Sequence, residues 1–256
     1  MQPSVLAIAA HPDDIEFVMA GTMLQLAAVG WKLHYFNIAN GCCGSKNLDA
    51  STCASVRLKE AASAAQAMPA EFYPPICDDL QIFYDHATHA KVASVIRQVQ
   101  PSIVLTHAPL DYMEDHQNTA RLAVGGAFAR GMPNFDTVPA AAAYDADIAV
   151  YHAQPHGNRD PLGTLVVPTY FVDVSDQMPK KRELLACHAS QDQWLDESQG
   201  MSSYLQTMVD LNHEVGTLSA QFEFAEGWRR HLHYGLADAN YDPLRAALGD
   251  QLAIRA

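Results

Sequence analysis

VLAIAAHPDDIEF, residues 5–17, contains the strongest indication of the fold. Its first half, Val5 to Ala10, is a short apolar run, which is typical of a strand covered on both faces in a parallel sheet. A histidine and two acids follow at once, separated by Pro12, which stiffens the turn and favours an extended His11. Ionisable side chains therefore appear at the point where a buried strand is predicted to end.

The residues after this turn predict a strand–helix–strand unit. Apolar residues recur at helical spacing over residues 15–29, and Gly30 follows as a stop signal. Residues 33–39 predict a second strand. This order places two parallel strands side by side with a right-handed crossover between them.

Alternating elements continue along the chain, without an internal repeat or a convincing linker. The sequence therefore predicts one domain over residues 1–256, with an α/β fold, a mainly parallel sheet and a less regular extension after about residue 140. Further helices are predicted over 51–68, 89–99, 118–130, 177–188 and 202–215, and further strands over 80–84, 102–106, 148–152 and 165–174.

Composition narrows the class of protein. The 256 residues are 49% hydrophobic, which is enough for a large core. A net charge of −13 disfavours nucleic acid or an anionic membrane as a partner, because phosphates would be repelled. No signal peptide and no apolar run of roughly 20 residues is present. We therefore expect a cytoplasmic protein without membrane insertion.

Five cysteines occur without a CxxC pair, which suits free thiols in a reducing compartment. The adjacent Cys42 and Cys43 could hold a soft metal, but the sequence identifies no partner ligands for them.

Two loops predict a metal site. Ligands in open α/β sheets bind beyond the carboxyl ends of the strands, where His11 and Asp14 lie. The loop THAPLDYMEDHQNT, residues 106–119, follows another predicted strand and carries His116 among several acids. Two imidazoles and one carboxylate from these residues would hold a catalytic zinc ion and leave a position for water.

The remaining acids of these loops predict a division of roles. Asp13 would lie beside the metal rather than on it, and would take a proton from the water that the metal acidifies. Asp115 would orient a ligand from the second shell of the site.

Several segments resemble the PIG-L/LmbE family of zinc-dependent de-N-acetylases. The resemblance covers about residues 4–230, and its segments are AHPDD (10–14), VRLKEAASAA (56–65), DYMEDHQNT (111–119), KKRELLACHASQ (180–191) and FAEGWR (224–229). It implies a Rossmann-like three-layer sandwich and hydrolysis of the acetyl amide of N-acetylglucosamine, a related amino sugar or a conjugate. It also implies zinc on His11, Asp14 and His116, Asp13 as general base, and Arg57 at the substrate. Asn40 and Asp85, which follow predicted strands, are further candidates for substrate contacts.

One position departs from the family pattern. The family usually has His-Pro-Asp-His, in which the first histidine supplies the general acid, whereas this chain has Met113 there. Methionine cannot donate a proton. Three groups are open as substitutes: His188, which fits a structural role equally well, Tyr112 as an oxyanion donor, and Asp13 as a shuttle.

Two other functions stay open at this stage. The missing acid is compatible with a zinc-dependent hydratase of an unsaturated dicarboxylic acid, a reaction that the family resemblance also reaches, or with a non-catalytic metal- or carbohydrate-binding relative. The loops 41–50, 108–115 and 153–163 are expected to border the substrate. The sequence also leaves open whether the native metal is zinc or another divalent ion. It is compatible with a homo-oligomer as well.

Overall fold

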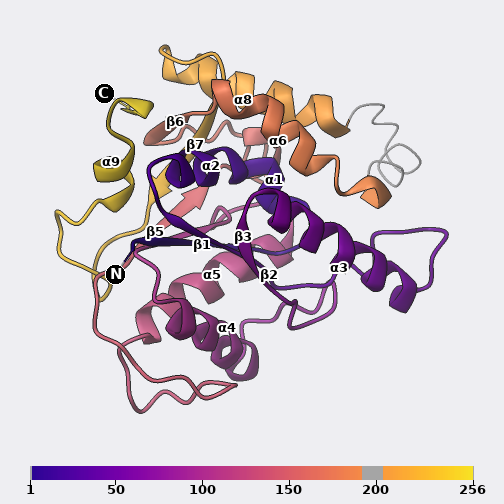
Figure 1. Ribbon diagram of the computed structural model, residues 1–256, viewed down its shortest axis with the longest axis vertical. Helices are drawn as coiled ribbons and strands as arrows, with labels where there is room; N and C mark the ends of the chain where they lie inside the picture. The colour runs from indigo at the N-terminus through magenta and orange to yellow at the C-terminus, as the bar shows by residue number, and fades with distance from the viewer. Residues whose placement is uncertain (1, 192–203, 256) are drawn as a thin grey trace.

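The computed structural model describes residues 2–191 and 204–255, whose strands form one sheet in the order β3-β2-β1-β4-β5-β7-β6-β8 (Figure 1). The first five of these strands are mutually parallel, and β7, β6 and β8 add antiparallel pairs. The prediction of an α/β fold with a mainly parallel sheet is confirmed. The strands are β1 (Ser4–Ala9), β2 (Lys32–Asn37), β3 (Ala70–Tyr73), β4 (Ile103–Thr106), β5 (Ala149–Ala153), β6 (Tyr170–Asp173), β7 (Ala225–Arg230) and β8 (Leu252–Ile254).

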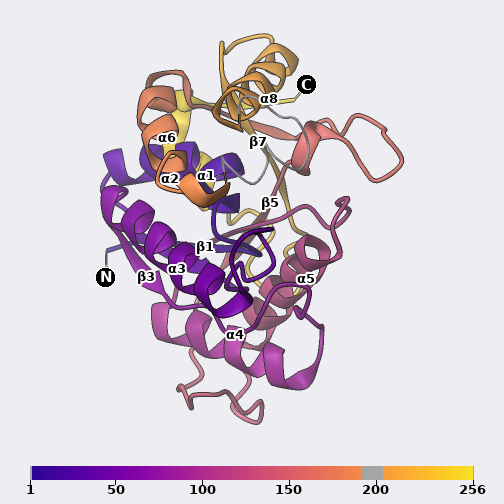
Figure 2. The ribbon, with the colours of Figure 1, turned by 90° about the vertical axis from the view of Figure 1, so that its right-hand side faces the viewer.

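Helices cover both faces of the sheet, which makes three layers. One group, α1, α2, α3, α6 and α8, packs on one face, and α4 and α5 pack on the other (Figures 1 and 2). The helices are α1 (Asp14–Val18), α2 (Ala20–Ala28), α3 (Ala50–Ala67), α4 (His86–Val99), α5 (Glu114–Ala129), α6 (Met178–Leu185), α8 (Tyr204–Ser219) and α9 (Pro243–Leu248), with short 3-10 turns η1 (His156–Asn158), η2 (Ser175–Gln177) and η3 (Gly249–Gln251). No helix in the described ranges is long and apolar enough to cross a bilayer.

Strand β1 lies at the centre of this sandwich. Val5 and Ala7 face the core under α1 and α2, whereas Leu6 and Ile8 face the core under α4 and α5. All four side chains are fully buried. Burial on both faces explains why the run is entirely apolar instead of alternating.

The predicted helix over residues 15–29 is two helices in the structure. It breaks at Met19, whose φ of −132° is not helical. The carboxylate of Glu226 accepts hydrogen bonds from the amides of Gly21 and Thr22, both at 2.8 Å. A carboxylate at these free amides stabilises a new helix N-terminus, and the sequence near the helix does not reveal it because Glu226 lies about 200 residues away.

The predicted strand over residues 80–84 is wrong. Leu80 has a φ of +60°, which is incompatible with a continuous strand, and the following residues are irregular. The strand predicted over 165–174 is shorter, Tyr170–Asp173, because Pro168 interrupts the run. β3, β7 and β8 were not predicted, and β6, β7 and β8 make the region after residue 140 part of the same sheet. The predicted helix 202–215 begins outside the described residues, and its described part lies in α8.

Candidate metal-binding and catalytic site

Hydrogen bonds from within the turn and from the end of β2 hold the turn that leaves β1. The amide of His11 donates to Asp14 Oδ2 at 2.7 Å, and the Asn37 side chain donates to the His11 carbonyl at 2.6 Å. Asp13 has a φ of 107°, a left-handed conformation that few residues other than glycine adopt. Such strain persists where the surroundings hold it in place, and here it lies beside the predicted metal ligands.

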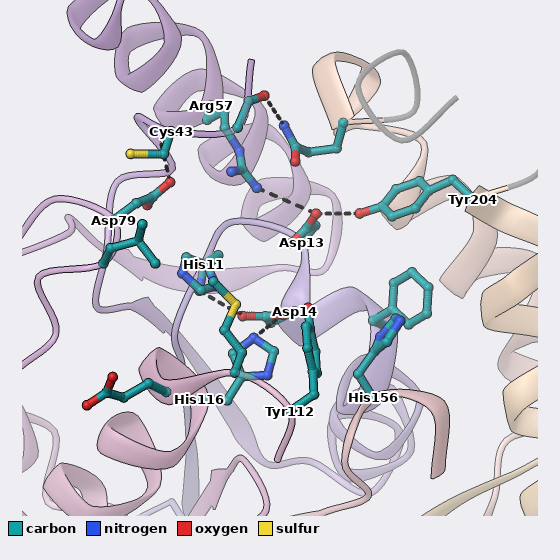
Figure 3. A pocket seen from close by; sticks show the side chains of 16 residues that line it. His11, Asp13, Asp14, Cys43, Arg57, Asp79, Tyr112, His116, His156 and Tyr204 are labelled. Carbon is teal, nitrogen blue, oxygen red and sulfur yellow. Dashed lines mark hydrogen bonds and ion pairs between the residues drawn. The ribbon is translucent and has the colours of Figure 1, made fainter. Parts of the chain in front are cut away.

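The three predicted ligands come together (Figure 3). His11 Nδ1 lies 3.4 Å from Asp14 Oδ2, and His116 Nε2 lies 3.4 Å from Asp14 Oδ1. One ligand atom from each residue lies within 4.8 Å of the others. The turn from β1 into α1 and the first turn of α5 therefore deliver two nitrogens and a carboxylate to one point.

Each of the two histidines has a carboxylate on its other nitrogen. His11 Nε2 lies 3.0 Å from Asp115 Oδ2, which also accepts the Leu80 amide at 2.8 Å. His116 Nδ1 lies 3.0 Å from Asp111 Oδ1. This pairing fixes the ring tautomers and raises the basicity of the free nitrogens, as in metal sites with carboxylate–histidine pairs. Asp115 therefore contacts one candidate ligand, His11, and Asp111, which we did not predict, contacts the other, His116.

The electrostatics of the cluster favour a cation. Burial lowers the pKa of His11, but hydrogen bonds with Asp115 and Asp14 outweigh it and raise the pKa to about 10. Burial likewise opposes charge on His116, yet Asp14 and Asp111 raise its pKa. Burial would raise the pKa of Asp14, but the surrounding imidazoles hold it well below its usual value. Negative charge thus draws a proton to the cluster, and the same donor set fits a divalent metal ion.

His107 supports this cluster from behind. Its ring stacks on that of His116, with centroids 4.1 Å apart. Its Nε2 atom lies 3.3 Å from Asp14 Oδ2 but accepts the Ala10 amide at 2.9 Å. Because that nitrogen is already an acceptor, His107 packs against a candidate ligand and is not itself free to bind a metal through Nε2.

Asp13 lies beside the ligand cluster with partners of its own. The Tyr204 hydroxyl donates to Asp13 Oδ2 at 2.6 Å, and Arg57 Nη2 lies 3.5 Å from the same oxygen. Burial raises the pKa of Asp13, and the Arg57 guanidinium opposes that rise. Arg57 also donates to the carbonyls of Pro12 at 2.5 Å and Gly41 at 3.3 Å, so it ties the turn after β1 and the loop after β2 to α3. Gly41 has a φ of +75°, and a Cβ there would lie 2.5 Å from the Arg57 side chain.

A cavity of about 470 Å³ opens over these groups, in the range of small-molecule sites. Residues from all three expected loops line it: Cys43 and Gly44, Tyr112 to Glu114, and His156. Met113, at the position of the missing acid, immediately precedes α5, makes no capping hydrogen bond with its side chain, and lines this cavity.

Three predicted residues lie outside the cavity lining. His188 is fully buried, with Nε2 3.3 Å from Glu16 Oε2, so it has no path to a substrate amine. Asn40 donates to Asp78 Oδ1 at 2.5 Å. Asp85 caps α4 by accepting the Thr88 amide at 2.8 Å. The structure therefore supports a structural role for these residues, and of the proposed substrate contacts only Arg57 reaches the cavity.

Three further lining residues were not singled out in the sequence, although one of them, His156, lies in an expected loop. Tyr204, Phe17 and His156 form a partly aromatic wall, with ring centroids 5.4 Å apart for Phe17–Tyr204 and 5.3 Å for Phe17–His156. They come from α8, α1 and η1, and only the fold brings them together.

Comparison with known proteins finds a match to one family model and relatives with two kinds of activity. Residues 6–125 match the family model described as PIG-L: GlcNAc-PI de-N-acetylase. The chain is 29% identical to diacetylchitobiose deacetylase of Thermococcus kodakarensis over 195 residues, 73% of this chain and 69% of the relative. It is 27% identical to 4-oxalmesaconate hydratase of Pseudomonas putida over 240 residues, 88% of each chain.

Among solved structures, N,N'-diacetylchitobiose deacetylase from Pyrococcus horikoshii, complexed with its inhibitor MPG, has a similar fold. The TM-score is 0.75 at 22% identity, covering 93% of this chain and 87% of that chain.

Proposed function

Because residues 6–125 form a PIG-L family domain, we propose that this protein is a metal-dependent hydrolase that removes the N-acetyl group of an amino sugar or its conjugate. The diacetylchitobiose deacetylase relative supports this reaction. The observation that carries the proposal is the pair of adjacent acids in one turn, of which Asp14 faces two histidines while Asp13 faces Tyr204 and Arg57.

His11, Asp14 and His116 would hold the metal, with Zn²⁺ as the expected ion. When bound, a divalent ion at such ligands supplies Lewis acidity, which polarises a carbonyl and increases the acidity of water. Asp111 and Asp115 would keep the two histidines in the tautomers that face it.

Asp13 would move the proton. As a carboxylate it accepts a proton from the attacking water, and as a carboxylic acid it returns that proton to the nitrogen of the leaving amine. The hydroxyl of the water then belongs to the released acetic acid, and the amine leaves neutral, so the step balances without another donor. This role fits a chain with Met113 in place of a histidine and with His188 buried outside the cavity.

Tyr112 would contribute at the entrance. Its side chain is 63% exposed, and its ring lies edge-on to that of His116 at 5.6 Å. A phenol is a hydrogen-bond donor at neutral pH, so Tyr112 would donate to the developing oxyanion or to a sugar hydroxyl.

Charge around the cavity favours an N-acetyl sugar over a dicarboxylate. Four acids, Asp13, Asp14, Asp79 and Glu114, line it, and Arg57 is the only lysine or arginine among the described lining residues. That guanidinium already contacts Asp13 and two carbonyls. Apart from the proposed metal ion, an unsaturated dicarboxylate would find no free side-chain cation among the described lining residues for its second carboxylate, whereas a neutral sugar needs none.

The hydratase is the second candidate, because the hydratase relative matches a longer part of the chain than the deacetylase does. A substrate panel decides between them. Protein loaded with defined metals is given N-acetylglucosamine, diacetylchitobiose and an unsaturated hydroxy-dicarboxylate, and free amine, acetate and loss of the alkene are measured. Deacetylation without alkene hydration supports the proposal, and the reverse overturns it.

Asp13→Asn tests the mechanism in the same assay. Asparagine tolerates a positive φ, so the turn is kept. We expect unchanged metal content and a loss of turnover of about 100-fold or more. Asp85→Asn, which alters a cap outside the cavity, is the control. If Asp13→Asn keeps full turnover, Asp13 is not the general base. If no preparation binds metal, a non-catalytic protein is favoured.

The setting of the reaction is also part of the proposal. The five cysteines are free thiols, which supports a cytoplasmic protein. We expect one catalytic domain and a small-molecule substrate.

A further inference from the structure

Two adjacent cysteines lie at the edge of the cavity. Cys42 and Cys43 follow Gly41 in the loop after β2, and their Sγ atoms are 3.9 Å apart. Two sulfurs bound to one tetrahedral zinc at about 2.3 Å are about 3.8 Å from each other. The pair therefore already has the spacing of a metal dithiolate, well beyond the roughly 2.05 Å of a disulfide.

Asp79 adds a third ligand to this pair. One of its carboxylate oxygens and the two sulfurs all lie within 4.8 Å of one another. Asp79 Oδ1 accepts the Gly41 amide at 2.6 Å and Oδ2 accepts the Cys43 amide at 2.9 Å. These hydrogen bonds come from the loop that carries the cysteines, so they hold the carboxylate in register with the thiols.

We propose that Cys42, Cys43 and Asp79 form a second metal site, selective for a thiophilic divalent ion. Cd²⁺ would bind there, and so would Zn²⁺ present beyond the amount that the first site takes up. Two sulfurs and one oxygen make a softer donor set than the two imidazoles and one carboxylate of the first site. Three ligands leave one coordination position for water or a substrate atom.

An ion at this site inhibits the enzyme. Cys43 and Asp79 line the same cavity as His11 and Arg57, and in Figure 3 they lie on the Arg57 side of it, apart from His116. Occupancy would narrow the entrance and place positive charge beside Arg57. This consequence rests on the proposed function, whereas the binding site itself does not.

Cd²⁺ titration of the metal-free protein tests the site, because cadmium–thiolate bonds absorb in the ultraviolet and bonds to nitrogen and oxygen do not. We expect the absorption to grow until one equivalent has bound to thiolates. Cys42→Ser/Cys43→Ser should lose it while still binding Cd²⁺ at the first site. Serine keeps the amides that Asp79 accepts, and a thermal melt checks that the variant is folded. Cys187→Ser, at the end of α6, is the matched control and should keep the absorption.

Two results would overturn the site: no thiolate absorption in the wild type, or equal absorption in the double variant. Inhibition by Zn²⁺ is measured separately. For each protein, the deacetylation rate in excess Zn²⁺ is compared with the rate of the same protein at one equivalent of metal. Inhibition about tenfold weaker in the double variant supports the inhibitory role, and equal inhibition overturns that role alone. If Cd²⁺ binds to the thiolates but the protein has no deacetylase activity, the second metal site stands and the proposed function is overturned.

Discussion

His116 Nδ1 lies 3.0 Å from Asp111 Oδ1, and this contact determines which nitrogen of the ring faces Asp14. Asp111 Oδ1 also accepts the Met113 amide at 3.2 Å, which ties the carboxylate to the start of α5. Asp111 is 1% exposed, so water does not compete for the contact. The pair is therefore a rigid support for one of the candidate metal ligands.

Asp111→Asn should weaken metal binding about 10- to 100-fold, because the amide cannot provide the negative charge that makes the imidazole a better ligand. The measurement is competition for Zn²⁺ with a chelator of known affinity. Asp85→Asn is the control, since it also replaces an aspartate but outside the cavity, and its affinity should equal that of the wild type. Unchanged affinity in Asp111→Asn would mean that His116 does not bind the metal.

Tyr204→Phe should move the acid limb of the pH profile of kcat/KM to higher pH. The Tyr204 hydrogen bond lowers the pKa of Asp13, so its removal raises that pKa, and the carboxylate base is lost at a higher pH. A hydrogen bond to a charged group is worth roughly 1.5–3 kcal/mol, which corresponds to about tenfold or more in rate on the acid side. The ring packing against Phe17 is kept.

Deacetylation rates across a pH series, for wild type, Tyr204→Phe and the exposed Tyr84→Phe, provide the measurement. A uniform loss of rate at every pH would indicate that Tyr204 acts only by packing.

His152 should make the fold sensitive to acid. Its Nδ1 donates to the His107 carbonyl at 2.8 Å, and its Nε2 accepts from His231 Nδ1 at 2.9 Å, so the folded protein requires the neutral ring. Burial lowers its pKa to about 4. The unfolded chain takes up this proton below about pH 6.5, so stability falls as the pH drops from there to 4, by on the order of 3 kcal/mol.

Urea unfolding of the metal-free protein at pH 7, 5 and 4 measures this effect. His152→Asn, which can still donate to the His107 carbonyl, should be less stable at pH 7 but lose about 3 kcal/mol less on acidification than the wild type. The exposed His86→Asn should follow the wild type. Parallel pH dependence in all three proteins would show that His152 does not carry the effect.

Local patterns predicted the parts of this fold and site that lie within short segments. The apolar run before His11 and the acids after it are adjacent in sequence, so the strand, the turn and two candidate ligands could be predicted together. His116 needed only the rule that parallel strands end at one edge. The partners of Asp13 could not be predicted in this way, because Tyr204 lies 191 residues away and meets it only through the packing of α8.

The failed predictions have the same origin. The strand over 80–84 was predicted from its apolar residues, yet Leu80 is held in a left-handed conformation with its amide on Asp115. His188 was a candidate acid because a histidine was missing elsewhere, and burial against Glu16 removes it from the cavity. A tertiary contact outweighs the local pattern in both cases.

Met113→His tests whether the chain lacks a general acid. The residue faces the cavity at the start of α5, so a histidine there would supply a proton donor next to the ligand cluster. General acids contribute about 100- to 10,000-fold, and an unoptimised one should still increase deacetylation about tenfold. Met113→Leu keeps the size and apolarity of the side chain and should not change the rate. If Met113→His equals Met113→Leu in rate while both keep their metal, the expected gain is overturned, and the Asp13 shuttle alone already protonates the leaving amine efficiently. A tenfold gain would instead show that protonation of the leaving amine limits the wild-type reaction.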